Sequence, residues 1–282
     1  MSGFSADWLS RREPADHRAR DSGLLDRLAA WAASRDSLSI VDLGCGTGSN
    51  ARAVIPRLSA TQHWRLIDYD PALLAVALEK TAALAGTQMR AFTFKTEQAD
   101  FAHGVDALLA ADCDIVTAAA LFDLVSKEWL DGLVACLAAR KLPLYTVLIY
   151  DGAMTWEPAH PADETLRRAF NTHQRTDKGF GPAAGPEAGP HLAARLTEAG
   201  YDVATASTPW RLGPEDHALL VTSAVGVANA ARELGGIPEA DIDAWLDFRR
   251  REKAGSCLIG HVDVLALPRT WPGRDRETEV ET

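Results

Sequence analysis

The stretch Ile40–Asn50 (IVDLGCGTGSN) constrains the fold of this chain more than any other. A short apolar run ends at Asp42 and is followed by glycines at positions 44, 46 and 48. This pattern is typical of a buried strand that enters a turn too tight for side chains. Glycine there permits positive φ, close approach of a ligand to the backbone, and close packing of the next helix. Because that helix would point its N-terminal amides at the turn, the stretch predicts an α/β fold with a nucleotide-like ligand.

Two acidic positions follow further along the chain, each at the end of a predicted strand. The strand at about residues 64–68 ends in Asp68, roughly twenty residues past the last glycine, where a nucleoside ribose would offer its hydroxyls. A third strand, at about residues 90–96, is followed by Asp100 and Phe101. The motifs therefore recur in an order that suits one nucleoside-containing ligand.

With a fourth strand at residues 113–118 (CDIVTA), these motifs resemble those of the class I S-adenosylmethionine-dependent methyltransferases over roughly residues 38–150. The first motif of that family is an acid followed by three alternating glycines, whereas a dinucleotide site favours Gly or Ala at position 49, where this chain has Ser49. The resemblance implies a Rossmann-like, seven-stranded, mostly parallel sheet with an antiparallel last strand, helices on both faces and a helical cap. It also implies S-adenosylmethionine as cofactor and S-adenosylhomocysteine as product.

The resemblance implies cofactor contacts residue by residue. Asp68 is expected to accept the ribose hydroxyls, Asp100 to hold the adenine amino group, and Phe101 to pack against the adenine ring. Among the N-terminal arginines 12, 18 and 20, Arg18 is expected at the methionine carboxylate. The predicted cofactor-binding residues are Asp42, Gly44, Cys45, Gly46, Gly48, Asp68, Tyr69, Asp100, Phe101, Ala118 and Arg18.

Hydrophobic periodicity and turn residues divide the chain around one α/β core, which 282 residues with 47% hydrophobic content can support. The predicted units are an N-terminal helical segment over the cofactor (1–37), a methyltransferase domain (38–270) with a lid (152–190) and a helical insertion between the last two strands (213–253), and a disordered tail (271–282). The further predicted elements are helices at about 22–33, 127–139, 164–171, 187–199, 214–234 and 238–253, and strands at about 144–151, 201–208 and 256–267. The long irregular stretch from 152 is read as a lid because it contains aromatic residues.

Two residues are candidates for the catalytic base. Asp123 follows the fourth strand, close to where the methyl acceptor sits in the enzymes that the chain resembles; the alternative is an aspartate that caps or precedes the next helix. His173 lies in a polar cluster of the predicted lid and titrates in the working pH range, and its alternative is a surface histidine at a helix end. His261, within the last strand, is predicted to be a hydrogen-bonded core residue. No spacing typical of metal ligands occurs, so no metal is predicted.

Composition narrows the class of partner. The net charge of -10 disfavours a nucleic-acid substrate, because phosphate binding needs basic patches. The charged residues near the start of the sequence predict that there is no signal peptide. The longest uncharged stretch is too short to span a bilayer. The four cysteines lie far apart and form no pair with the spacing of metal ligands. We therefore expect a cytoplasmic enzyme of the EC 2.1.1 type that acts on a small molecule, with its oligomeric state and the methylated atom left open.

Other readings of the motifs stay open at this point. A protein or tRNA methyltransferase would have an open, basic cleft. A nicotinamide-dependent oxidoreductase on a similar fold would bind nicotinamide cofactors, and a non-catalytic S-adenosylmethionine binder would need a stable partner protein.

Overall fold

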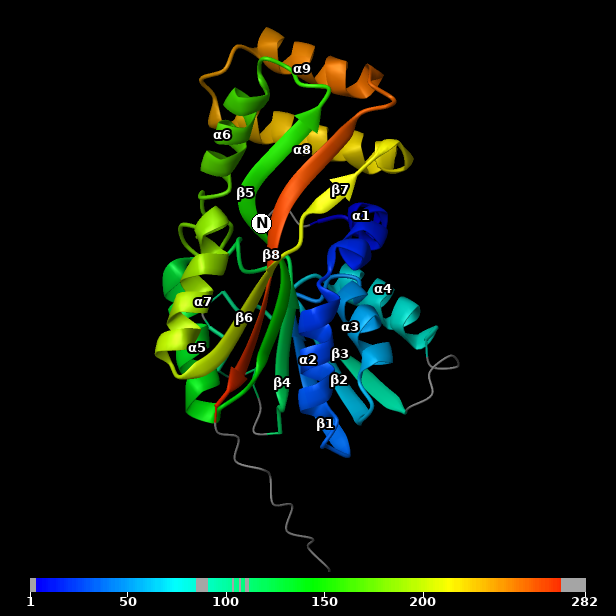
Figure 1. The fold of residues 1–282 in the computed structure, drawn as a ribbon, viewed down its shortest axis with the longest axis vertical. Helices are drawn as coiled ribbons and strands as arrows, with labels where there is room; N and C mark the ends of the chain where they lie inside the picture. The colour runs from blue at the N-terminus through cyan, green and yellow to red at the C-terminus, as the bar shows by residue number, and fades with distance from the viewer. Residues whose placement is uncertain (1–3, 85–90, 103, 107, 110–111, 270–282) are drawn as a thin grey trace, which may run out of the picture.

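A single sheet organises the computed structural model, which describes residues 4–84, 91–102, 104–106, 108–109 and 112–269. The strands are β1 (Ser37–Leu43), β2 (Thr61–Asp68), β3 (Phe92–Gln98), β4 (Ile115–Ala119), β5 (Leu144–Glu157), β6 (Tyr201–Ser207), β7 (Trp210–Leu212) and β8 (Ser256–Pro268). Their order is β3-β2-β1-β4-β5-β8-β6, with β7 paired to β8 (Figure 1). β1 to β5 are parallel, and β8 runs antiparallel to β5, β6 and β7. The predicted Rossmann-like sheet is thus confirmed, with the short β7 as an addition; the predicted tail, 271–282, lies outside the described residues.

Helices cover both faces of this sheet. They are α1 (Ala6–Ala19), α2 (Ser22–Ala32), α3 (Ser49–Val54), α4 (Pro71–Ala82), α5 (Lys127–Arg140), α6 (Asp163–His173), α7 (Ala188–Glu198), α8 (His217–Leu234) and α9 (Glu239–Arg251), with short 3-10 turns η1 (Ile55–Arg57), η2 (Gly185–Glu187) and η3 (Pro214–Asp216). Along β1, Leu38 and Ile40 pack toward α2, α3 and α4, whereas Val41 and Leu43 pack toward α5 and α7. This division into two apolar layers is what burying a parallel sheet requires.

Local capping explains where several helices begin. The carboxylates of Asp21 and Asp70 accept hydrogen bonds from the backbone N–H groups of Leu24 (2.7 Å) and Ala72 (2.8 Å). Ser126 does the same for Trp129 at 3.1 Å. Each cap satisfies a donor that the first turn leaves unpaired, so these helix starts follow from the sequence.

The N-terminal segment differs from its prediction, because residues before the expected helix at 22–33 form α1. Ser5 caps α1 by accepting from the N–H of Trp8 at 3.2 Å. The buried face of α1 carries Asp16, which accepts hydrogen bonds from Arg12 (2.8 Å) and from Trp210 Nε1 (3.0 Å). Helix prediction looks for an apolar stripe, and α1 has polar contacts in its place.

The upper part of Figure 1 shows a second region beyond the sheet, which we call the helical extension (residues 151–173 and 209–260). β5 was expected to end at residue 151 and to be followed by an irregular lid, but it runs on to Glu157 and pairs with β8 up to Ser256. The helical extension also contains β7, α6, α8 and α9, which surround the paired ends of β5 and β8 (Figure 1). The first part of the predicted lid is therefore regular structure.

A bend, which we call the joint, connects the sheet to the helical extension. The pairing of β5 with β8 shifts register between Thr146 and Ile149, where Leu148 adopts a φ of 60°. The fully buried Asp263 accepts hydrogen bonds there from the N–H of Leu148 (2.9 Å) and the hydroxyl of Thr208 (2.8 Å). Its second carboxylate oxygen accepts from the N–H of Asp21 at 3.0 Å. One side chain thus holds the bulge, the link from β6 to β7 and the start of α2 together.

A buried ion pair lies within the helical extension. Arg249 on α9 is 4% exposed and pairs with Asp163 at the start of α6. Asp163 also accepts from Trp245 Nε1 at 2.7 Å, and Arg249 donates to the carbonyl of Pro158 at 2.7 Å. The guanidinium lies 5.1 Å from the ring of Trp156. These contacts tie α6 and α9 to the end of β5.

Candidate active site

The glycine turn joins β1 to α3 at the carboxyl edge of the sheet. Its three glycines, Gly44, Gly46 and Gly48, all have positive φ. A Cβ at Gly46 would lie 3.0 Å from Leu9 of α1, and one at Gly48 would lie 2.9 Å from the hydroxyl of Thr81. The turn therefore requires glycine both for its backbone conformation and for the close approach of α1 and α4.

Asp68 is bound directly to this turn. Its carboxylate accepts hydrogen bonds from the N–H of Gly46 (2.8 Å) and the N–H of Asp70 (3.0 Å). Burial raises the pKa of Asp68, and these backbone bonds oppose that change. Tyr69, the next residue, is 45% exposed. A carboxylate with spare lone pairs thus lies at the end of β2, beside the turn, as the sequence predicts.

Asp42 lies at the buried end of β1. It is 0% exposed, and one carboxylate oxygen accepts from Asn50 (2.7 Å) and Thr117 (2.8 Å). Its Oδ2 has no hydrogen-bond partner among the described residues, and burial raises its pKa. Arg20 donates to Asn50 at 2.9 Å. These bonds tie the end of β1 to α3 and β4, and the cofactor contact expected of Asp42 stays a prediction.

Asp100 and Phe101 follow β3. Asp100 is exposed, and its carboxylate accepts from the N–H of Ala102 at 2.9 Å. Phe101 is 5% exposed, with its ring centroid 6.2 Å from that of Trp129 and 5.9 Å from that of Phe180. Phe180 belongs to the second part of the predicted lid, so the chain between α6 and α7 returns to the sheet at this point.

The remaining predicted cofactor residues have distinct surroundings. Cys45 and Ala118 are buried, and burial raises the pKa of the Cys45 thiol. Arg18 is exposed and donates to both carboxylate oxygens of Asp216 at 2.7 Å. This pairing links α1 to η3 and engages the guanidinium that was expected at the methionine carboxylate.

Asp123 stands out among the acidic residues. Its side chain is 6% exposed, and Oδ1 has no hydrogen-bond partner in the described part of the chain. Burial raises the pKa of Asp123 to about 6, while hydrogen bonds from its own N–H and that of Tyr150, and the positive charge of Arg12, act in the opposite direction. Ser126, not Asp123, caps the following helix, so Asp123 precedes α5 without capping it.

The glycine turn and Asp123 are connected through neighbouring side chains. Leu121, two residues before Asp123, lies 3.2 Å from where a Cβ at Gly44 would stand. On the other side, α1 contacts Gly46 through Leu9 and carries Arg12 one helical turn later. The side chains around Asp123, which we call the Asp123 cluster (Arg12, Asp123, Tyr150 and His261), therefore border the turn.

His261 on β8 belongs to the same cluster. It is 6% exposed, as its core prediction requires, yet its Nδ1 finds no hydrogen-bond partner among the residues described. The ring lies 5.2 Å from Trp210 and 6.3 Å from Tyr150, centroid to centroid. Burial, with help from the positive charge of Arg12, lowers the pKa of His261 to about 3 against the opposing effect of the Ile259 backbone, so the ring is neutral at physiological pH. In the sequence, the signal for His261 was a histidine inside a predicted apolar strand.

His173 has a different environment. It ends α6, and its Nε2 lies 2.9 Å from the carboxylate of the exposed Glu233 on α8. Its Nδ1 is 3.4 Å from Lys178 Nζ. These contacts match the helix-end alternative, and the cluster formed by Asp123 and His261 does not include His173.

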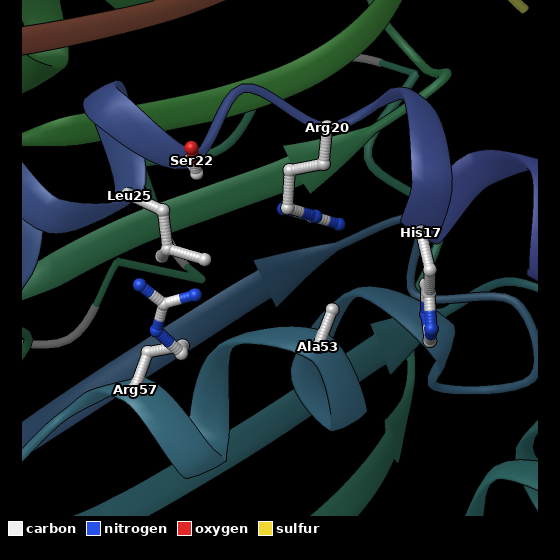
Figure 2. A pocket seen from close by; sticks show the side chains of 6 residues that line it. All are labelled: His17, Arg20, Ser22, Leu25, Ala53 and Arg57. Carbon is white, nitrogen blue, oxygen red and sulfur yellow. The ribbon is translucent and has the colours of Figure 1, made fainter.

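A cavity of about 220 Å³ opens between α1, α2 and α3. Its lining residues are His17, Arg20, Ser22, Leu25, Ala53 and Arg57 (Figure 2). Arg20 reaches toward the strands from the link between α1 and α2, while Arg57 reaches up from η1. The cavity lies over the face of the sheet beside α3, and none of its lining residues belongs to the glycine turn or the Asp123 cluster.

Two further properties concern the described residues alone. They contain no group of three or more His, Cys, Asp or Glu residues arranged to hold a metal ion. None of their helices combines the length and apolarity that crossing a bilayer demands.

Comparisons with known proteins agree with this architecture. Residues 41–140 match a family described as a methyltransferase domain. The cyclopropane synthase MmaA2 from Mycobacterium tuberculosis is 11% identical, with a TM-score of 0.50 and coverage of 93% of this chain and 94% of that one. An S-adenosylmethionine-dependent methyltransferase from Geobacter sulfurreducens, in complex with S-adenosyl-L-homocysteine, is 16% identical, with a TM-score of 0.47 and coverage of 95% and 100%. None of the curated proteins matches the sequence.

The matched segment runs from β1 to α5 and includes the glycine turn, Asp68 and Asp123. The likeness to MmaA2 independently supports the fold. The nicotinamide alternative is therefore set aside. The match over residues 41–140 identifies a methyltransferase domain in this chain, and the protein is an S-adenosylmethionine-dependent methyltransferase of the EC 2.1.1 type.

Proposed function

We propose that this methyltransferase acts on a small-molecule acceptor, which binds beside Asp123, with Asp123 as the base. The observation that carries the proposal is the Asp123 carboxylate, which is 6% exposed and has an oxygen without a partner in the described residues. A buried polar atom of this kind costs free energy unless a ligand satisfies it. The cost is consistent with a functional site.

The groups around the turn suit the adenosyl part of the methyl donor. Asp68 offers acceptor lone pairs for ribose hydroxyls, and exposed Asp100 can accept from an exocyclic amino group. Phe101 supplies an apolar ring in a cluster with Trp129 and Phe180. The contact of α1 with Gly46 supports the expectation that the N-terminal segment covers the cofactor.

Methyl transfer is an in-line displacement at the sulfonium carbon of the bound donor. The protein holds an acceptor atom in line, removes its proton where it has one, and excludes water. Asp123 is ionised above its pKa of about 6 and can then take the acceptor proton on Oδ1. Burial of the cluster keeps water from competing.

The same surroundings favour a small acceptor. The reacting atom must reach a carboxylate that is 6% exposed, which a compact molecule can do more readily than a nucleic acid or a folded protein surface. The net charge of -10 further disfavours a polyanionic acceptor.

The test measures S-adenosylhomocysteine formation by the wild type and by Asp123→Asn, with the small-molecule fraction of a cell extract, the protein fraction and bulk tRNA as separate acceptors. We expect turnover with the small-molecule fraction alone, a fall of about 10²–10⁴-fold in the variant, and unchanged affinity for S-adenosylhomocysteine. Wild-type turnover should rise with pH through about 6, because Asp123 must be ionised. Asp131→Asn, an exposed aspartate on α5 paired with Arg195 and His191, is the matched control and should keep wild-type turnover.

His173→Ala tests the other candidate base. Because His173 pairs with exposed Glu233, its loss should leave turnover within about twofold of wild type. A loss as large as that of Asp123→Asn would transfer the role of base to His173. Methylation of the protein fraction or of tRNA would overturn the small-molecule acceptor, and binding of S-adenosylhomocysteine with no transfer to any fraction would indicate a non-catalytic binder.

A further inference from the structure

We propose that His261 is a second hydrogen-bonding contact for the methyl acceptor, and that His261 and Asp123 together select acceptors with hydroxyl or amino groups over acceptors with carboxylate or phosphate groups. This inference rests on the proposed function. It adds a residue and a chemical class that the cofactor motifs do not specify.

The position of His261 relative to Asp123 carries the first step. Tyr150 of β5 is the register partner of His261, and the N–H of the same Tyr150 binds the Asp123 carboxylate. The guanidinium of Arg12 acts electrostatically on both side chains. Asp123 and His261 therefore meet at one place, where β5, β8 and α1 come together.

Both side chains leave a hydrogen-bonding atom unsatisfied there. Asp123 Oδ1 and His261 Nδ1 have no hydrogen-bond partner in the residues that the structure describes, and each residue is 6% exposed. Other polar atoms nearby are satisfied: Asp16 binds Arg12 and Trp210, and the hydroxyl of Tyr150 donates to Asn171 at 2.7 Å. Two unsatisfied atoms in a satisfied neighbourhood point to a ligand that bonds to both.

The charges of the cluster decide the chemical class. Arg12 makes a bidentate pair with Asp16 (2.8 and 3.1 Å), so these two side chains together carry no net charge, although the guanidinium still acts on Asp123 and His261. His261 is neutral, which leaves the Asp123 carboxylate as the uncompensated charge. A carboxylate or phosphate on the acceptor would be repelled and desolvated there, whereas an O–H or N–H group can donate to Asp123.

The rings around His261 shape the same place. Trp210 lies 5.2 Å from His261 and is 3% exposed, and Trp8 of α1 lies 6.4 Å from Trp210. These rings and Tyr150 are apolar neighbours of two polar atoms, and small-ligand sites usually combine such side chains. A flat acceptor with one or two donor groups suits such a site.

The experiment uses two pairs of acceptors that share a ring but differ in charge: tyramine with 4-hydroxyphenylacetate, and histamine with imidazole-4-acetate. The full-length wild type, His261→Leu and His261→Asn are assayed by S-adenosylhomocysteine formation, and affinity for S-adenosylhomocysteine is measured by calorimetry. Val262→Ala is the control, because Val262 is the neighbour on β8 and points to the opposite face, toward Gly189.

We expect the wild type to methylate at least one amine and to reject its carboxylate partner. His261→Leu should raise the KM for the amine by roughly 5- to 100-fold, the effect of one lost hydrogen bond, with a smaller change in kcat. His261→Asn, whose amide can take the place of Nδ1, should restore KM to within about threefold, and Val262→Ala should resemble the wild type.

Preference for the carboxylates, or failure to methylate all four compounds, would overturn the acceptor class. An unchanged KM in His261→Leu would overturn the contact. Failure of the wild type to bind S-adenosylhomocysteine would refute the proposed function. If the wild type instead methylates the small-molecule fraction of the extract but none of the four compounds, only the acceptor class is wrong.

Discussion

The sheet and the helical extension share strand β5, yet they bury it in different ways. From Leu144 to Tyr150 every residue is buried, whereas from Asp151 to Glu157 exposed and buried residues alternate. A strand covered on both faces is continuously buried, and a strand covered on one face alternates. One strand therefore passes from a three-layer region into a two-layer region at the joint.

The two regions also differ in what fixes their structure. In the sheet, the local conformation follows from glycines and from apolar residues on two faces. In the helical extension, one buried ion pair connects α6, α9 and the end of β5. The comparison teaches that the motif-bearing region can be recognised from its sequence, whereas the region beyond it depends on particular tertiary contacts.

The largest expected effect tests the ion pair. Arg249→Met removes the partner of Asp163 and should lower the free energy of unfolding by about 3–5 kcal/mol, because a buried charge is left uncompensated. Urea denaturation measures the loss, and hydrogen exchange should locate it in the helical extension. Arg250→Met, at an exposed neighbour, should change stability by less than about 0.5 kcal/mol. Equal effects of the two substitutions would remove the contrast between the regions.

A second effect belongs to the joint and depends on pH. The folded-state pKa of Asp123 is raised from 3.8 to about 6, so its contribution to stability is complete below pH 3.8 and is lost as pH rises through 6. The free energy of unfolding of Asp123→Asn, relative to that of the wild type, should therefore rise by up to about 3 kcal/mol between pH 4 and pH 8. Thermal unfolding across this range measures the gain, and a difference independent of pH would contradict the raised pKa.

A third effect concerns the sheet. Asp68→Ala should weaken S-adenosylhomocysteine binding by about 1–3 kcal/mol, because Asp68 is expected to hydrogen-bond the ribose. Calorimetric titration measures the change, with Asp202→Ala, at an exposed aspartate paired with Arg27, as control. Unchanged affinity would place the ribose acceptor elsewhere.

The smallest effects compare two glycines. Gly46→Ala should lower stability by about 1–2 kcal/mol, because its φ is positive and Leu9 lies close. Gly132→Ala, within α5 where no heavy atom lies within 4 Å of the added Cβ, should raise stability by about 0.5–1 kcal/mol. Chemical denaturation of both variants tests the opposite signs; a shared sign would mean that position in the turn does not matter.

Sequence patterns predict most of the sheet because its signals are local. The turn at 44–48, the acid ending β2 and the helix cap at Asp70 all depend on residues within a few positions. The end of β5 was missed because Gly152 and Ala153 weaken an alternating pattern that Met154 and Trp156 complete. Its strand conformation depends on pairing with β8, about a hundred residues later.

The site was predictable to a similar extent. Asp123 was named as a candidate base from its place after a strand, and that role stays a prediction; whether it capped a helix required the structure, which gives the cap to Ser126. His261 was predicted as a hydrogen-bonded core residue, and its burial agrees, but its unsatisfied Nδ1 could not be foreseen because it depends on neighbours on β5, β7 and α1. The pairing of Arg18 with Asp216 likewise joins residues far apart in the sequence.

The interior position of β8 has a consequence for the order of folding. β8 lies between β5 and β6, although it is the last strand of the described chain. Until residues 256–268 are synthesised, β5 and β6 each present an unpaired edge, which is a site for aggregation. The same strand then completes the sheet and the helical extension together. Folding of the two regions is thus coupled to the synthesis of residues 256–268, and the long-range pairing of β8 makes that step slow.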